Sequence, residues 1–186
     1  MAQQTGFGIQ EFYRTAVDRG LARTNLFRIK NIEGIFNSED TDLLIYAQGG
    51  SIPSRSISTA KVSFKTFDFV VPMAASYPEN QSWSVTFYCD TDYILRDIFE
   101  GWSRKTFDEH KQINTSNLVN MEVVLLDNSS ASPTEVPKMA EVRSYKFIGC
   151  FPTQVGAMSY SVGNAGELAT MSVTIAFQYI ISSKNV

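Results

Sequence analysis

The segment ATMSVTIAFQYI, residues 169–180, carries the clearest secondary-structure signal in the chain. Its side chains alternate between apolar and polar, which is the two-residue period of a half-buried β-strand. The apolar face consists of Met171, Val173, Ile175, Phe177 and Tyr179. The opposite face consists of Thr170, Ser172, Thr174, Ala176 and Gln178. We therefore predict one continuous strand whose second face carries no charge.

The same alternation marks a strand in NQSWSVTFYCD, residues 80–90. Its apolar face consists of Trp83, Val85, Phe87 and Cys89, and its polar face of Ser84, Thr86 and Tyr88. Further strands are predicted at residues 25–32, 42–47, 118–127 and 141–151. Gly49, Gly50 and Pro53 predict a loop after the second of these.

A long hairpin is predicted in SISTAKVSFKTFDFVVPM, residues 56–73, because polar and apolar residues alternate there over an unusual length. Arg55, Lys61 and Lys65 make a small basic cluster on this hairpin. Three interpretations stay open: a nucleic-acid contact, a charged edge that discourages wrong strand pairing, or a salt-bridging contact between subunits.

Two helices are predicted. Near the N-terminus, Ile9, Phe12, Tyr13, Ala16 and Val17 share one helix face, and Gly20 lies where a C-terminal cap is needed. The second helix follows a cap at Asp90 or Thr91 and runs to about Lys105. Its predicted apolar face is Ile94, Ile98 and Trp102, with Leu95 and Phe99 beside them.

The order of these elements predicts a mainly β, antiparallel sandwich or barrel, with the central helix packed on it and a short N-terminal helix. Strands do not alternate with helices, so a parallel sheet is not expected. We expect one domain over residues 1–186, with a flexible N-terminus at 1–7 and a polar surface loop at 128–138.

Composition excludes several classes of protein. The net charge of −3 argues against a dedicated nucleic-acid grip. Cys89 and Cys150 are too few for a disulfide framework or a zinc site and are predicted to be buried free thiols. The N-terminus shows no signal-peptide pattern, and no apolar run approaches the ~20 residues of a membrane span. We expect a soluble protein made in a cytoplasm.

We find no catalytic or metal-binding pattern, so we expect no enzyme, no cofactor and no metal. His110, the only histidine, is best read as a solvated helix-end residue. The carboxylates at 39–42 lack the ligand ladder of a calcium loop. The segment GNAG, residues 163–166, favours a hairpin turn over a phosphate cradle. If the polar strand faces lie on one side of one sheet, copies of the chain can close that sheet into a barrel around water.

Four segments together resemble the tail tube proteins of contractile-tailed bacteriophages. They are GLARTNLFRIKNI (20–32), YAQGGSIPSRSI (46–57), WSVTFYCDTDYILRDIFEGW (83–102) and the closing run from residue 147 to residue 180. The closing run, FIGCFPTQVGAMSYSVGNAGELATMSVTIAFQYI, is the strongest of the four. All four segments occur in the family's order and spacing, and the resemblance spans most of the chain, from residue 20 to residue 180.

The resemblance implies a virion protein whose hexameric rings stack into a tube inside a contractile sheath, with DNA ejected through the tube. Implied partners are other copies of the chain, the sheath protein, the baseplate tube-initiator, and the tape measure protein and DNA inside the lumen; no membrane insertion is implied. Lumen-facing candidates are Thr170, Ser172, Thr174, Gln178, Ser84 and Thr86. Candidates for hairpin contacts between rings are Arg55, Lys61, Lys65 and Asp68.

Two other hypotheses remain. The chain can instead be a tube-initiator or the tube of a phage-derived contractile injection system, which shares the motifs. In a different class, it can be a β-sandwich module that binds carbohydrate or protein through Tyr77, Trp83 and Tyr88.

Overall fold

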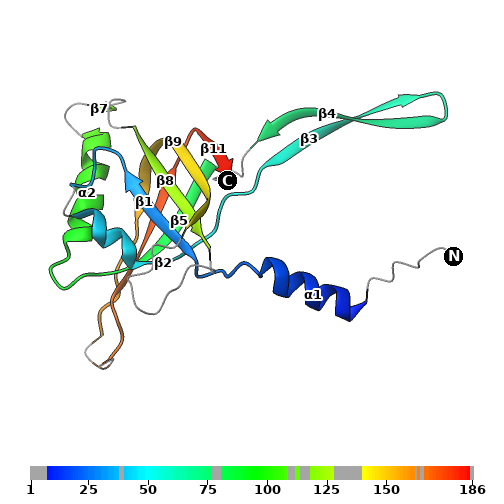
Figure 1. The fold of residues 1–186 in the computed structure, drawn as a ribbon. Helices are drawn as coiled ribbons and strands as arrows, with labels where there is room; N and C mark the ends of the chain where they lie inside the picture. The colour runs from blue at the N-terminus through cyan, green and yellow to red at the C-terminus, as the bar shows by residue number, and fades with distance from the viewer. Residues whose placement is uncertain are drawn as a thin grey trace.

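A computed structural model describes residues 8–37, 40–76, 81–108, 112–113, 118–127, 140–161, 163 and 166–184 of the chain. A β-rich body carries two arms that extend from the same side of it (Figure 1). One arm is helix α1 (Ile9–Arg19), and the other is the hairpin of β3 (Ser56–Phe64) and β4 (Phe67–Ser76). Both elements were predicted, and Gly20 caps α1 with a φ of 69°.

The body is one antiparallel sheet with strand order β1-β8-β9-β10-β5-β2, and β11 also pairs with β9. The strands are β1 (Phe27–Ile32), β2 (Ala47–Gly50), β5 (Ser82–Tyr88), β8 (Val119–Leu126), β9 (Glu141–Val155), β10 (Thr170–Ala176) and β11 (Tyr179–Lys184). This confirms the predicted mainly β, antiparallel class.

Strand β9 belongs to both parts of the folded sheet. Its residues 141–150 pair with β8 and β11, and its residues 151–155 pair with β10. We call β1, β8, β11 and residues 141–150 of β9 the β8 half. We call β10, β5, β2 and residues 151–155 of β9 the β10 half. The two halves enclose the core between them.

Alternating side chains from both halves fill that core, as the two-residue period predicts. The β10 half contributes Trp83, Val85, Phe87, Met171, Val173 and Ile175, and the β8 half contributes Ile29, Ile32, Met121, Val123, Phe147 and Cys150. The rings of Trp83 and Phe147 join the halves, with centroids 5.5 Å apart. Cys150 is fully buried as predicted, whereas Cys89 is only partly buried, and both are free thiols.

Helix α2 (Ile94–Thr106) packs on β9 and closes the core (Figure 1). Its buried side chains are Leu95, Phe99 and Trp102. Trp102 belongs to the predicted apolar face, Leu95 and Phe99 were expected beside that face, and Ile94, predicted on it, is 40% exposed. The helix is therefore rotated toward the residues expected to flank its core face. After it, β6 (Phe107–Asp108) and β7 (Gln112–Ile113) form a short hairpin that was not predicted.

The strand predicted at residues 42–47 is wrong. Residues Asp40–Tyr46 form a 3₁₀ helix, η1, and β2 begins only at Ala47, so part of the predicted loop is strand. The backbone carbonyl of Asn37 accepts hydrogen bonds from the backbone N–H groups of Asp40 and Thr41 and from the Thr41 hydroxyl. These local bonds start a helical turn, which outweighs the strand preference of a short apolar run.

The closing strand predicted over 169–180 is also divided. It breaks after Ala176, and the chain resumes as β11 on the other half of the sheet. Tyr179, predicted on the core face, is 49% exposed, while Ile180 packs against the core. The alternation of buried and exposed side chains therefore shifts by one residue at the break. The sequence does not reveal this shift, because polar and apolar residue types keep alternating through it.

Other expectations lie outside the described residues: the flexible N-terminus at 1–7, the loop at 128–138 and the position of His110. The single-domain organisation stays a prediction. No helix in the described ranges combines the length and hydrophobicity needed to cross a bilayer. Those ranges also hold no group of three potential metal-binding side chains.

Candidate assembly surfaces

The outer face of the β10 half is polar and continuous across its strands. Ser172 lies opposite Thr86, and Thr174 lies opposite Ser84, so the polar residues predicted on two separate strands form one surface. Gln154 of β9 extends it beyond Thr174. Thr170, Ser172 and Ser84 are exposed, and Thr174 and Thr86 are half-buried.

This surface contains no formal charge. The strand segments 47–50, 82–88, 151–155 and 170–176 include no Asp, Glu, Lys, Arg or His. Because these side chains are hydroxyls and amides, the face is wetted by water but exerts little electrostatic force on an ion.

Gly156 lets the chain pass closely over this face. Its backbone N–H donates to the Ser172 carbonyl oxygen at 2.6 Å. A Cβ atom at residue 156 would lie 2.3 Å from Ser172 Oγ and 2.8 Å from the Ser172 carbonyl oxygen. Only glycine fits this approach without displacing strand β10.

Gln178 does not continue the row of Thr170, Ser172 and Thr174. It is exposed, but it lies at the break between β10 and β11, where its backbone N–H donates to the Ile148 carbonyl. Its side chain lies against Gly149, whose φ of 67° favours glycine. Of the predicted set, five residues lie together and Gln178 lies apart from them.

The outer face of the β8 half is charged, in contrast. Lys30 Nζ lies 3.0 Å from Glu141 Oε2 and 3.9 Å from Glu122 Oε1, and the hydrogen bond to Glu141 raises the pKa of Lys30. Hydrogen bonds from Asn120 and then Lys146 lower the pKa of Glu33. The Glu33 pairs are exposed and the Lys30 pairs are only partly buried, so each stabilises the fold only slightly. The molecule therefore has one charged face and one uncharged face.

The charged residues predicted at the hairpin do not form a basic cluster. Lys61 Nζ lies 2.5 Å from Asp68 Oδ2 across the strand pair. This bond, with one from Ser63 Oγ at 2.6 Å, lowers the pKa of Asp68. Lys65 lies in the turn with a φ of 55°, whereas Arg55 precedes β3 at the opposite end of the hairpin. The basic-cluster interpretation is therefore wrong, because about 30 Å of strand separates its ends.

The opposite face of the hairpin is apolar and uncovered. The cross-strand pairs Ala60–Val71, Val62–Phe69 and Phe64–Phe67 lie on one face of the two-stranded sheet. Phe64 is 61% exposed and Phe67 is 69% exposed. A hairpin of two strands is marginally stable alone in water, so this face requires a partner.

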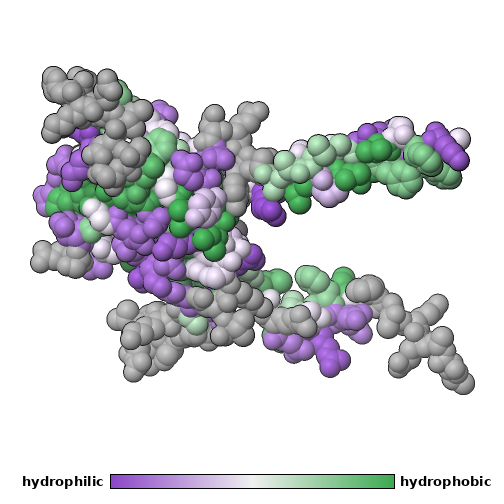
Figure 2. Space-filling model, turned by 90° about the horizontal axis from the view of Figure 1, so that it is seen from above, coloured by the Kyte–Doolittle hydropathy of each residue, from purple (hydrophilic) through white to green (hydrophobic). Residues whose placement is uncertain are grey.

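Helix α1 also exposes its apolar stripe. Ile9, Phe12, Tyr13 and Val17, predicted to share one helix face, are all exposed in the single chain. Figure 2 shows the hydrophobic side of this helix turned toward the hairpin. An isolated helix of 11 residues is marginal in water, so α1 needs packing that the described body does not provide.

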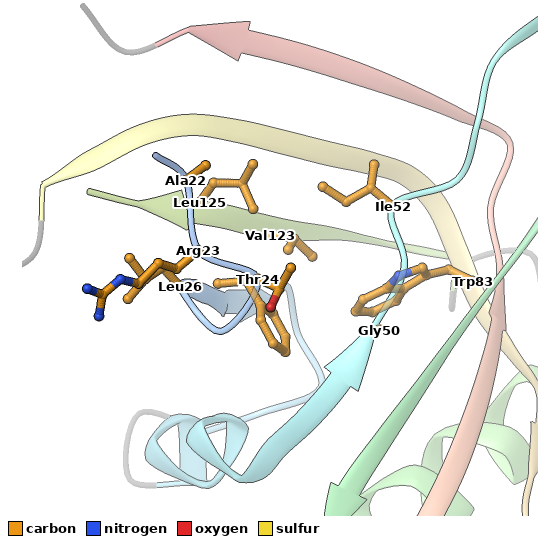
Figure 3. A pocket seen from close by; sticks show the side chains of 10 residues that line it. Ala22, Arg23, Thr24, Leu26, Gly50, Ile52, Trp83, Val123 and Leu125 are labelled. Atoms are coloured by element: carbon orange, nitrogen blue, oxygen red, sulfur yellow. The ribbon is translucent and has the colours of Figure 1, made fainter. Parts of the chain in front are cut away.

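A cavity of about 330 Å³ lies at the bases of the two arms (Figure 3). We call it the arm-base pocket; its lining includes Thr24, Leu26, Gly50, Ile52, Trp83 and Val123. It lies between β1 and β2, the two end strands of the sheet order. The Trp83 indole nitrogen, Nε1, is buried and has no hydrogen-bond partner among the described residues.

Sequence reasoning missed this pocket and misjudged the arms. The alternation of residues 60–71 predicted an apolar hairpin face, but not that the chain would leave it uncovered. The unusual length of the alternation could have indicated this uncovered face. A hairpin that extends beyond its own domain has no surface of that domain to pack against.

A folded sheet with one uncharged face, one charged face and two uncovered apolar arms defines a structural subunit that packs against other chains. The chain belongs to the phage tail tube protein family, whose model matches residues 11–182. This is a family of structural tube proteins and not of enzymes. The resemblance seen in the sequence is thus confirmed.

Solved structures share the fold at low sequence identity. A chain of the sheath–tube complex of the extracellular contractile injection system PVC, in its extended state, is 11% identical with a TM-score of 0.60, covering 93% of this chain and 97% of that chain. A chain of the anti-feeding prophage baseplate is 12% identical with a TM-score of 0.59, covering 88% of this chain and 96% of that one. No curated protein matches the sequence.

Proposed function

We propose that this chain is the repeating subunit of the inner tube of a contractile phage tail. Hexameric rings stack head to tail, and genomic DNA passes through the tube into the host. The observation that carries this proposal is the uncharged outer face of the β10 half, combined with membership of the tail tube family.

The β10 half supplies the wall of the channel. It has four strands, which are β2, β5, β10 and the end of β9. Four strands from each of six copies make roughly 24 strands, and at about 4.8 Å spacing and about 40° tilt the backbone barrel is roughly 45–50 Å wide. Duplex DNA fits within this width after side chains narrow it.

The lack of charge suits rapid passage of DNA. Each phosphate neutralised by Lys or Arg would add a salt-dependent attraction and slow the movement of the duplex. Ser84, Thr86, Thr170, Ser172 and Thr174 provide hydrogen-bonding side chains without that attraction. On the hairpin, Lys61 is paired with Asp68, and Lys65 lies in the turn at its far end.

The charged face of the β8 half lies on the opposite side of the body and is the side available to the sheath protein. The tube-initiator of the baseplate would contact the first ring, and the tape measure protein would occupy the lumen before DNA. In this view the protein functions in the virion after synthesis in the host cytoplasm.

A second candidate is the tube, or the tube-initiator, of a phage-derived contractile injection system. It is favoured by the fold shared with chains from the anti-feeding prophage and PVC particles. The two candidates differ in lumen content, DNA or effector protein, and copy number separates a tube subunit from an initiator. A carbohydrate-binding module is less favoured, because Trp83 is 2% exposed and lies in the core.

Electron microscopy of the purified full-length protein tests the proposal. We expect rings with six-fold symmetry and tubes that lengthen with protein concentration. A Cys introduced by Ser172→Cys should be shielded in tubes from a bulky maleimide, and one introduced by Arg28→Cys on the charged face should react. A protein that stays monomeric at every concentration and cannot extend preformed tubes would refute the proposal.

A further inference from the structure

The two arms start from neighbouring points on the body. The lining of the arm-base pocket takes Ala22, Thr24 and Leu26 from the segment between α1 and β1. It takes Gly50 and Ile52 from the end of β2 and the segment that leads to β3. Figure 3 shows these two parts of the chain bordering the same cavity. A movement of one arm onto the other therefore needs no long connection.

The uncovered apolar faces of the two arms match in length. The stripe on α1 from Ile9 to Val17 spans about 12 Å, at a rise of about 1.5 Å per residue. The apolar face of the hairpin runs from the pair Ala60–Val71 to the pair Phe64–Phe67, which is about 13 Å of strand. Neither face contains a charged side chain. The two faces can therefore cover each other almost completely.

The segment that follows α1 is long enough to bring the helix onto the hairpin. Gly20 ends the helix with a φ of 69°, and a Cβ atom there would meet nothing within 4 Å, so the chain has room to turn. In the described part of the chain, the first backbone bond to the sheet is at Leu26, whose carbonyl accepts from an N–H of β8. Residues 20–25 span up to about 20 Å when extended. This exceeds the roughly 13 Å of strand between Ser56, where β3 begins, and Ala60.

Closing the arms in this way would bury no charge. Arg14 Nε lies 3.9 Å from Asp18 Oδ2, both side chains are strongly exposed, and the pair lies on the side of α1 away from Tyr13. The Lys61–Asp68 pair lies on the hairpin face opposite the apolar one. Figure 2 shows the hydrophobic side of α1 already turned toward the hairpin, so the helix needs no rotation about its own axis.

The short connection favours the helix of the same chain over that of a second copy. Two groups joined by a short flexible segment meet at an effective concentration in the millimolar range, far above that of subunits in dilute solution. In a tube, neighbouring copies are held next to each other and offer competing apolar surfaces at similar effective concentration. Assembly would therefore shift the equilibrium toward open arms.

We propose that α1 closes on the apolar face of its own β3–β4 hairpin in the free subunit and opens when the subunit joins a tube. This inference rests on the proposed function, since the tube supplies the surfaces that displace the helix. The closed state covers both arms of a single chain. It keeps free subunits apart until the end of a growing tube displaces α1.

Disulfide trapping in the free subunit tests the closed state. The full-length double variant Tyr13→Cys, Val62→Cys carries Cys89→Ala, and the remaining native thiol, Cys150, is fully buried. On oxidation at micromolar concentration, we expect a bridge within one chain, seen as a monomer on a non-reducing gel. The matched pair Tyr13→Cys, Ser63→Cys, on the opposite hairpin face, should stay reduced. Nuclear Overhauser contacts between the Tyr13 ring and the Val62 methyl groups should report the same closure in the unmodified subunit.

Bridges formed only between chains would overturn the proposal in favour of a second copy as the occupant. Absence of any bridge would also overturn it, and so would equal yields from the two pairs, which would show that the helix swings without a preferred contact.

The same bridge tests the role of closure in assembly. The oxidised Tyr13→Cys, Val62→Cys subunit should extend preformed tubes at least about tenfold more slowly than the same protein after reduction. The Tyr13→Cys, Ser63→Cys protein should extend them equally under both conditions. Normal extension by the bridged subunit would overturn this inference and leave the proposed function standing. Absence of rings and tubes from the unmodified chain would refute the proposed function, and with it the role in assembly, even where the bridge forms.

Discussion

At the scale of single residues, Gly156 and Gly101 make opposite demands on the fold. A Cβ at residue 156 would collide with Ser172, whereas one at residue 101 meets nothing within 4 Å. We expect Gly156→Ala to lower the free energy of unfolding by about 1–3 kcal/mol through forced displacement of β10. Gly101→Ala should raise it by about 0.5–1 kcal/mol, because alanine is the better helix former. Thermal unfolding of the two variants beside the parent measures both; equal effects would show that the close contact at Ser172 relaxes freely.

The thiol of Cys150 predicts how stability depends on pH. Burial raises its pKa from 9.0 to about 12, so the folded state holds a proton that the unfolded chain loses. This contribution to stability is intact below about pH 9 and is lost as pH rises toward 12, with a slope of about 1.4 kcal/mol per pH unit.

Urea unfolding of the parent and of Cys150→Ala at about pH 8 and about pH 10.5 checks this sign. The variant should be less stable at the lower pH, because it leaves a cavity in the core, and its stability should fall less steeply between the two. A parallel fall in both proteins would mean that other groups dominate the alkaline transition.

Single-residue environments were predictable where they depend on the two-residue period. Trp83, Val85 and Phe87 face the core, and Ser84 and Thr86 face outward, as the alternation indicates. The role of Gly156 was not predictable, because it depends on an atom from a strand that is distant in sequence.

At the scale of elements, helix α2 depends on Asp90. The N-cap position is Tyr93 rather than the predicted Asp90 or Thr91, but the Asp90 carboxylate accepts from the backbone N–H of Ile94 at 2.8 Å and of Leu95 at 3.2 Å. Asp90→Ala should therefore cost about 1 kcal/mol of stability, and Asp92→Ala, an exposed neighbour, much less. Chemical denaturation followed by circular dichroism measures the difference, and equal losses would refute this stabilising role of Asp90.

Most elements follow from periodicity and end signals, including α1, β1, β5, β8 and the hairpin. Two did not. Local hydrogen bonds to Asn37 convert the expected strand at 42–47 into η1. The division of the closing strand depends on which half of the sheet each part pairs with, and that is decided by β9 rather than by residues 169–180.

At the scale of the whole molecule, the position of charge decides what passes through the proposed tube. Ser84→Lys adds a positive charge to the uncharged face, and Asn31→Lys adds the same charge on the β8 half. We expect tubes of the first variant to retain duplex DNA with an affinity that falls as salt rises, and tubes of the second to release it as the parent does.

Single-molecule measurement of labelled DNA leaving the tubes, at several salt concentrations, makes the comparison. Identical release from all three proteins would show that the face around Ser84 does not line the passage. The fold class and the uncharged strand faces were foreseeable at this scale. The separation of one charged and one uncharged face was not, because it arises only when the sheet folds into two halves.

Strand β9 has a mechanical consequence for such a particle. A force applied to the β8 half would reach the β10 half along one continuous backbone of 15 residues. It would not have to pass through side-chain contacts, which can slide past one another. Force from outside would then act on covalent backbone bonds, which do not slide past one another. The inner channel would therefore keep its diameter while the surrounding sheath contracts.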